Sequence, residues 1–169
     1  MQFDFKNGGA YKLKSDLIGY KKAYCSPRDY WRSDFKKAIL TLRVPGGQTV
    51  VVPDSDHKYD CIEETDVNGI MKTDKVYVQK IEDLDGKPIS DDFICTSSRS
   101  HGPQIPVNFD SNGVVIGHDY LSEWSGYVHR YKFGGKYESD LDLNHKNIFG
   151  NGYFFYSTKE QAKKSNEYY

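Results

Sequence analysis

The 169-residue chain is 37% hydrophobic and 15% aromatic, which is too aromatic for a disordered protein, so a packed core is expected. The longest apolar run, residues 153–156, has about four residues. A transmembrane helix needs roughly 20, so a membrane span is excluded. The formal net charge is −1, and the first six residues lack the apolar stretch of a signal peptide. We therefore expect a cytoplasmic protein, in the host cytoplasm if a phage encodes it.

Short strands separated by turns are the main prediction. In chain order, β-rich runs that stop at Pro, Gly or Asn-Gly predict strands over 38–44, 48–52, 61–67, 70–71, 76–81, 114–116, 127–133 and 152–156. Ser26 and Pro27 are typical of a helix start, and residues 28–37 could continue that helix. Thr158 and Gln161 have the three-residue spacing of a capping box, in which a Ser or Thr caps a helix and a Glu or Gln follows three residues later, and they predict a helix from about 159 to 167. Ser157 and Glu160 form an alternative capping box one residue earlier.

These elements predict a single domain over residues 1–169. Its class is α+β, with short antiparallel strands, a short N-terminal helix and a C-terminal helix. Residues 96–125 are rich in Ser, Gly, Pro, Asn and His, which predicts an irregular insertion. A loop of this length in a compact domain is usually functional.

Charge is distributed unevenly along the chain. Residues 1–50 carry ten Lys and Arg against four Asp and Glu, whereas residues 51–100 carry six against twelve. The basic first third could mark an anionic partner, but we favour the interpretation that the two segments lie side by side and neutralise each other. Eighteen of the 23 basic residues are Lys, and major-groove readers rely on Arg, so sequence-specific DNA binding is disfavoured.

The cysteines carry no recognisable site. Cys25, Cys61 and Cys95 are odd in number and lack CxxC spacing, so we expect three reduced, partly buried thiols rather than a disulfide scaffold.

Several strings resemble one known arrangement. They are Gly19-Tyr20-Lys21-Lys22, the strand 38–44 closed by Pro45-Gly46, Asp85-Gly86-Lys87, Tyr131-Lys132-Phe133-Gly134, Gly150-Asn151-Gly152-Tyr153-Phe154-Phe155 and Thr158-Lys159-Glu160-Gln161-Ala162. In order and spacing they resemble an uncharacterised domain found C-terminal to pentapeptide repeats in bacterial, phage and giant-virus proteins. The resemblance spans residues 19–165, although this chain has no pentapeptide repeats and carries the additional stretch at 96–125. It implies a fold and a phage or bacterial origin; it implies no reaction and no catalytic residues.

Motifs for metal and phosphate chemistry are not found. Residues 140–144 begin like a calcium loop, but His145 stands where Gly is needed and Asn151 where a bidentate Glu is needed. The chain has no phosphate-binding glycine loop and no GxSxG elbow. We expect no cofactor and no metal.

A constellation suited to binding brackets the insertion. Arg and His can hold phosphate oxygens, while Trp and Tyr can stack on a base. The candidate ligand-binding residues are Arg99, His101, Gln104, Trp124, Tyr127, His129 and Arg130. The alternative is a solvated loop beside an aromatic core strand. If the loop does not bind, the next candidates are Lys21, Lys22, Arg28 and Arg32 in the basic first third.

The favoured function is a non-enzymatic binding protein encoded by a phage or mobile element. It would capture a nucleotide-type small anion or a host protein, in an anti-defence role by analogy. One alternative is a small hydrolase or transferase acting on a nucleotide, with His101, Glu123 and His129 as acid–base groups. Another is a protein-interaction module that uses Tyr as its adhesive residue.

Overall fold

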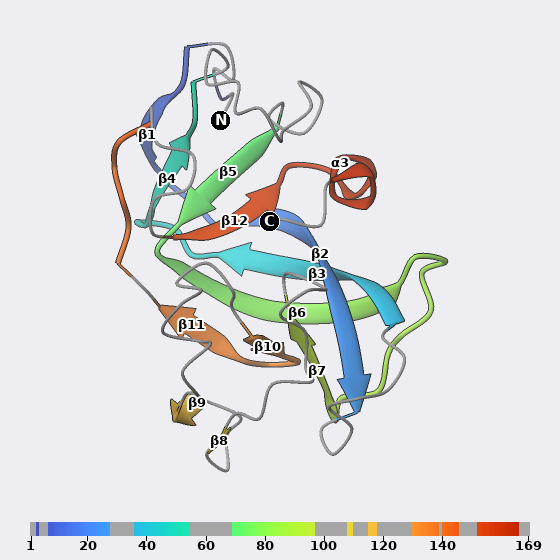
Figure 1. Cartoon of the computed structure of the whole chain (residues 1–169). Coiled ribbons are helices and arrows are strands. Elements are labelled where there is room, and N and C mark those ends of the chain that lie inside the picture. Colours follow the sequence, from blue (N-terminus) through green and yellow to red (C-terminus); the bar gives the residue numbers. More distant parts are fainter. Residues whose placement is uncertain are drawn as a thin grey trace.

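The computed structural model describes residues 3, 7–27, 36–54, 69–96, 108–109, 115–117, 130–138, 140–145 and 152–165. In these residues the protein is mostly β, with a ten-stranded antiparallel sheet, a separate two-stranded sheet and one short helix near the C-terminus (Figure 1). The elements are β1 (Gly9–Lys12), β2 (Leu17–Pro27), β3 (Lys36–Val44), β4 (Thr49–Val52), β5 (Ile70–Thr73), β6 (Lys75–Asp83), β7 (Phe93–Thr96), β8 (Asn108–Phe109), β9 (Val115–Gly117), β10 (Arg130–Lys132), β11 (Lys136–Glu138), β12 (Tyr153–Tyr156) and α3 (Lys159–Lys164).

The long strand β2 organises the main sheet, whose order is β1-β4-β5-β12-β2-β3-β6-β11. Along one edge, β2 pairs with β3 from Leu17 to Cys25. The other edge is shared, because Tyr20 pairs with Tyr156 of β12, whereas the residues from Tyr24 onward pair with β7. The sheet therefore forks at β2.

The strands on the β7 side close into a circuit. β7 pairs with β10, and β11 pairs with β6, which is the neighbour of β3. A turn at residues 133–135 joins β10 to β11, and Val78 of β6 exchanges backbone hydrogen bonds with Gly134 and Gly135, at 3.0 and 2.9 Å. The path β2-β3-β6-β11 thus returns to β2 through β10 and β7.

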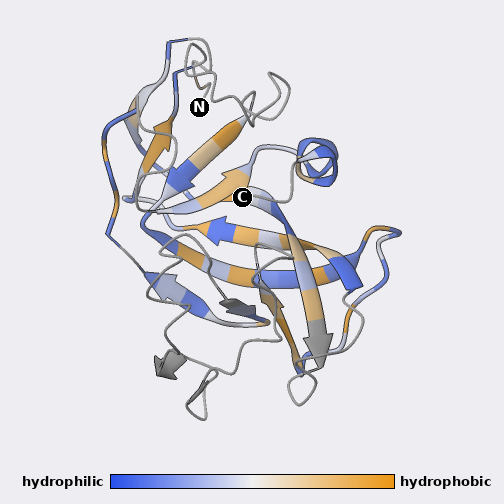
Figure 2. Cartoon of the chain, in the orientation of Figure 1, coloured by the Kyte–Doolittle hydropathy of each residue, from blue (hydrophilic) through white to orange (hydrophobic). Residues whose placement is uncertain are grey.

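The main core lies on one face of this curved sheet, which we call the inner face. Hydrophobic residues alternate with polar ones along several of its strands (Figure 2). The main core includes Leu40, Leu42, Val78, Tyr131 and Phe155. A β-bulge between Thr41 and Leu42 shifts the register of β3 against β6. A smaller cluster on the outer face packs under α3, and it consists of Ile39, Ile70, Phe154, Tyr156 and Ala162.

A close contact explains why a glycine stands at position 19. A Cβ atom there would collide with the ring of Phe155 on β12. The first and last motifs of the chain therefore meet at this point, because only glycine leaves room for the buried ring.

The C-terminal helix is confirmed. The backbone N–H of Gln161 donates to the Thr158 hydroxyl at 3.2 Å, so Thr158 is the N-cap. The hydroxyls of Ser157 and Thr158 also lie 2.8 and 3.1 Å from the Gln161 side-chain oxygen. The helix ends at Lys164 rather than at 167.

The predicted N-terminal helix is wrong at both of its described ends, and the described residues hold no N-terminal helix. Ser26 and Pro27 close β2, where they pair with Ile94 and Phe93, and Lys36 opens β3. Residues 28–35 lie outside the described residues. Proline is tolerated at the end of a strand, and pairing with a distant strand overrides the local helix signal.

The expectation of three free thiols is also wrong. Cys25 and Cys95 are paired residues of β2 and β7, with Cα atoms 4.0 Å apart, and their sulfur atoms are joined as a disulfide. Cys61 lies outside the described residues. The spacing of 70 residues gives no local signal, since only the strand register brings the two cysteines together.

The side-by-side arrangement of the basic and acidic segments is confirmed for β3 and β6. They pair over most of their length, with Ala38 opposite Asp83. Lys36 is among the charges that lower the pKa of Asp83, although hydrogen bonds from backbone amides, chiefly that of Lys87, are the larger cause.

Truncating the buried ring of Phe155 should destabilise the protein strongly. Phe155 is fully buried in the main core, so Phe155→Ala should lower the free energy of unfolding by roughly 3–5 kcal/mol. Phe133→Ala is the matched control, because Phe133 is 43% exposed. Urea unfolding of both variants measures the difference. Equal midpoints for Phe155→Ala and the wild type would contradict the assignment of β12 to the core.

Removal of the helix cap should have a smaller effect. Thr158→Ala removes the hydroxyl that accepts from Gln161, so stability should fall by about 1 kcal/mol. Thr158→Ser keeps a capping oxygen and should remain within a few tenths of a kcal/mol of the wild type. If alanine and serine are equivalent in thermal unfolding, Thr158 is not the cap.

Candidate functional site

The predicted ligand-binding residues lie largely outside the described part of the chain. Arg99, His101, Gln104, Trp124, Tyr127 and His129 all lie outside the described residues. Arg130 is described in its backbone only, as the first residue of β10, paired with Thr96. The proposed role of these seven side chains stays a prediction.

The structure does define where the predicted insertion leaves and rejoins the sheet. β7 ends at Thr96, β10 begins at Arg130, and these two residues pair directly. Residues 97–129 therefore leave and return at one point, which we call the neck. Within this segment β8 and β9 form the separate two-stranded sheet, with Asn108 opposite Gly117.

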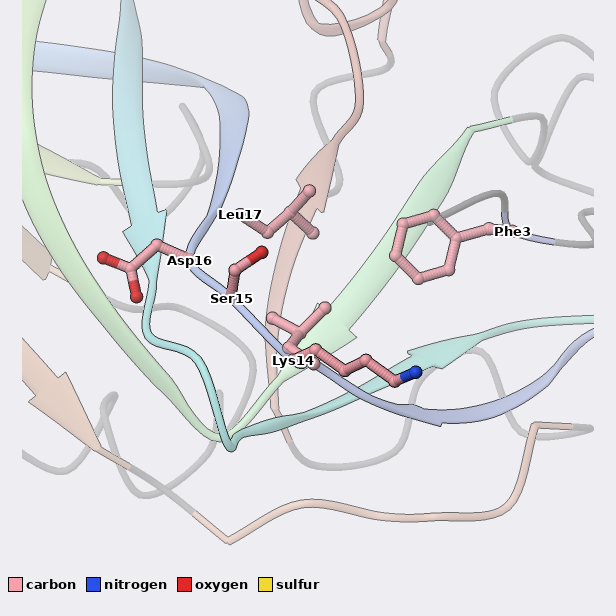
Figure 3. A pocket seen from close by; sticks show the side chains of 6 residues that line it. Phe3, Lys14, Ser15, Asp16 and Leu17 are labelled. Carbon is pink, nitrogen blue, oxygen red and sulfur yellow. The ribbon is translucent and has the colours of Figure 1, made fainter.

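A hollow at the other end of β2 is the best candidate site in the described residues. It lies beside the turn between β1 and β2, and its volume is about 460 Å³. It is lined by Phe3, Leu13, Lys14, Ser15, Asp16 and Leu17 (Figure 3). Leu13 is buried in the main core, so the floor of the hollow is apolar.

The polar groups of this hollow differ in their availability. Asp16 accepts hydrogen bonds from the Gly46 amide at 2.8 Å and from Arg43 at 3.2 Å. The Gly46 hydrogen bond is the main cause that holds the pKa of Asp16 below its usual value, with Arg43 contributing. Among the described residues, neither Lys14 nor Ser15 has a side-chain partner, so an ammonium and a hydroxyl are free to bind a ligand.

The aromatic ring that lines the hollow, Phe3, is supported by a second aromatic ring. The Phe3 ring meets the Tyr11 ring edge-on, with centroids 5.4 Å apart. The Lys14 side chain extends toward the side on which Phe3 lies, whereas Ser15 and Asp16 lie on the other side (Figure 3). An aromatic ring and an ammonium across an apolar floor can hold a molecule with a flat body and an anionic group.

The lysines named from the basic first third are committed to the fold. Lys21 is 2% exposed and donates to the Phe154 carbonyl at 2.8 Å. Lys22 reaches the carbonyls of Lys163 and Ser165 at the end of α3, at 3.4 and 3.3 Å. This placement argues against either lysine as a ligand-binding residue. Arg28 and Arg32 lie outside the described residues.

A second group of cations surrounds an aromatic ring on the outer face of β3, β6 and β11. Arg43 lies 4.3 Å from the centre of the Tyr77 ring, and Lys75 and Lys136 lie 5.9 and 6.0 Å from it. Glu138 pairs with both lysines. Because the ring and the carboxylate already engage these cations, the group is better explained as stabilising the sheet surface than as binding a ligand.

A metal centre is not visible in the part of the chain that is described, where His, Cys, Asp and Glu form no group of three or more. His145 instead contacts Asp54, with 2.7 Å between the imidazole Nδ1 and the carboxylate Oδ1, and the Asp54 amide donates to the His145 carbonyl at 2.8 Å. Within residues 140–144, whose sequence begins like a calcium loop, the Asn144 amide donates to the Asp142 carboxylate at 2.9 Å. Among the described residues, no helix is long and apolar enough to cross a bilayer.

The fold and hollow together define a mostly β protein with an elaborated hairpin at one end of β2 and an open hollow at the other. No family model matches the chain, and no solved structure matches it.

Relatives occur among proteins of Acanthamoeba polyphaga mimivirus. The chain is 31% identical over 175 residues to "Uncharacterized protein L87", covering 95% of this chain and 97% of that protein. It is 35% identical over 112 residues to "Uncharacterized protein L94", covering 64% and 79%, and 37% identical over 95 residues to "Uncharacterized protein L796", covering 56% of each. The chain therefore belongs to the giant-virus protein family that includes L87.

The buried Lys21 should make stability depend on pH. Burial lowers the pKa of Lys21 from 10.5 to about 7. Between these values the unfolded state binds the extra proton, so the folded state gains stability as pH rises from about 7 to 10.5. The slope is about 1.4 kcal/mol per pH unit.

Lys21→Met keeps the side-chain length and removes this titration. The stability of the wild type relative to Lys21→Met should therefore rise as pH increases from about 7 to 10.5. Lys12→Met on exposed β1 is the control and should keep the wild-type slope. Denaturant unfolding at several pH values measures both. Parallel curves for wild type and Lys21→Met would show that Lys21 is not buried as a neutral amine.

Proposed function

We propose that this protein is a non-enzymatic binding protein that captures a small anion of the nucleotide type. The hollow beside the β1–β2 turn is the observation that carries the proposal. It combines the Phe3 ring, an apolar floor and the free Lys14 ammonium in a space of about 460 Å³. Aromatic faces stack on bases, and charge-assisted hydrogen bonds hold phosphate oxygens.

The ligand would lie with its flat ring against Phe3 and its phosphate toward Lys14 and Ser15. Asp16 would not repel the anion strongly, because Arg43 and the Gly46 amide already compensate its carboxylate. Binding of this kind needs no general base and no metal.

The insertion is a second location for the same function. The predicted residues Arg99, Trp124 and Arg130 would supply two guanidinium groups and a stacking ring. The giant-virus relatives support a viral origin. By analogy, the captured nucleotide would be a host signal whose removal opposes a defence system.

We also propose that the family is the domain that follows pentapeptide repeats in other proteins. The motifs that carry this resemblance meet in the fold, since Gly19 lies against Phe155 and Thr158 caps α3 directly after β12. They form one structural unit rather than scattered matches.

Calorimetric titration of the full chain should find the ligand in a panel of nucleoside phosphates, cyclic dinucleotides, ADP-ribose derivatives and inorganic phosphate. Lys14→Ala should weaken nucleotide binding by roughly 1.5–3 kcal/mol, which is about tenfold or more in affinity. Lys12→Ala, an exposed lysine outside the hollow, should leave it unchanged.

Three further variants separate the two locations. If Arg99→Ala, Trp124→Ala and Arg130→Ala weaken binding while Lys14→Ala does not, the site is the insertion. Ligand recovered intact after heating supports capture, whereas a new product would replace the proposal by a nucleotide-directed enzyme. Absence of binding across the panel would leave the protein-interaction module as the better hypothesis.

A further inference from the structure

The disulfide lies at the neck of the insertion. Cys25 and Cys95 stand opposite each other in β2 and β7, and both residues are fully buried. Cys95 directly precedes Thr96, at which the chain leaves the sheet, and pairs with Tyr131 on its other side. The covalent bond therefore sits one residue from the point at which residues 97–129 depart.

The strand that carries Cys95 is short. β7 has four residues, and it is held by backbone pairing with β2 and β10, by the disulfide, by packing of Phe93 against the main core and by Lys36 over the Phe93 ring. β7 is the strand that joins β10 to β2, and so it completes the circuit of strands. A covalent link at this strand fixes both the circuit and the base of the insertion.

Burial decides when the bond can form. Neither sulfur is accessible in the folded protein, and thiol–disulfide exchange needs direct attack of one sulfur on another. Oxidation must therefore precede or accompany the docking of β7, and a reductant cannot reach the bond without opening the sheet.

We propose that this chain is a substrate of a dithiol-oxidising enzyme and works in an oxidising setting, as a component of the virus particle. In the oxidation step, the thiols of Cys25 and Cys95 lose two electrons and two protons and form one S–S bond. The disulfide of the oxidising enzyme accepts both and becomes a dithiol. Disulfides persist on virions and cell surfaces but are rare in the reducing cytosol, and the relatives of this chain are giant-virus proteins.

The first experiment tests the bond. The full chain is produced with and without an oxidising folding pathway, denatured, alkylated with N-ethylmaleimide and analysed by intact mass and peptide mapping. The oxidised product should carry one alkylated cysteine, Cys61, and a cross-linked peptide that joins Cys25 to Cys95. Three alkylated cysteines after oxidative folding would overturn the proposal.

The second experiment measures what the bond does. A link between residues 70 apart restricts the unfolded chain, so Cys25→Ala/Cys95→Ala should melt on the order of 10 °C below wild type. Cys61→Ala is the matched control and should melt with the wild type. Dithiothreitol should reduce the wild-type bond only when denaturant is added, and equal melting of all three proteins would contradict a structural cross-link.

The third experiment tests the setting. Thiols are trapped by acid and alkylation in cells infected with the virus that encodes the chain, and in its purified particles. We expect the oxidised form in particles. A fully reduced chain confined to the cytosol would overturn the proposal, and this outcome is independent of nucleotide binding.

Discussion

The division of one edge of β2 between two strands is the constraint on which the rest of the structure depends. β12 pairs with β2 at Tyr20, and β7 takes over from Tyr24. Each branch of this fork has a side-chain anchor on β2. Lys21 reaches the Phe154 carbonyl of β12, and Cys25 is bonded to Cys95 of β7. Each anchor therefore adds a side-chain link to the backbone pairing that joins its branch to β2.

The fork explains why a lysine is buried in an apolar core. The side chain of Lys21 lies on the face that Ala23 and Cys25 share, opposite Leu40 of β3. Its ammonium donates to one backbone carbonyl, and the described residues offer it no acidic partner. An amine so placed is held more favourably when neutral, so burial lowers its pKa.

The two candidate sites lie at opposite ends of β2. The hollow adjoins Leu17, where β2 begins, and the neck lies beside Tyr24, near its end. The two sites are supported in different ways. The hollow rests on core residues of the sheet, whereas the neck is fixed by a covalent bond and by two short strands. A ligand in the hollow would therefore meet a preformed floor, which lowers the ordering cost of binding.

Patterns within short stretches of the sequence were enough to predict several strands and the C-terminal helix. The strand predicted at 76–81, the buried strand predicted at 152–156 and the Thr158 cap follow from alternation, apolar composition and a three-residue spacing, and all three are present, the buried strand beginning one residue later, at Tyr153. The irregular insertion at 96–125 stays a prediction from composition, because most of it lies outside the described residues. The same reasoning could not place the hollow, since Lys14 and Ser15 look like ordinary turn residues until Phe3 lies across from them.

Only the tertiary structure decided the partners. Ser26 and Pro27 carry a helix signal, yet they form the end of a strand because β7 offers them backbone hydrogen bonds. Cys25 and Cys95 are joined, and Lys21 is buried, because the register between distant strands sets which side chains share a face. A one-residue change of register would reverse every one of these placements without altering the local sequence pattern. The sequence by itself thus determined where strands and the capped helix form, and contacts between distant segments determined the fork, the disulfide and the hollow.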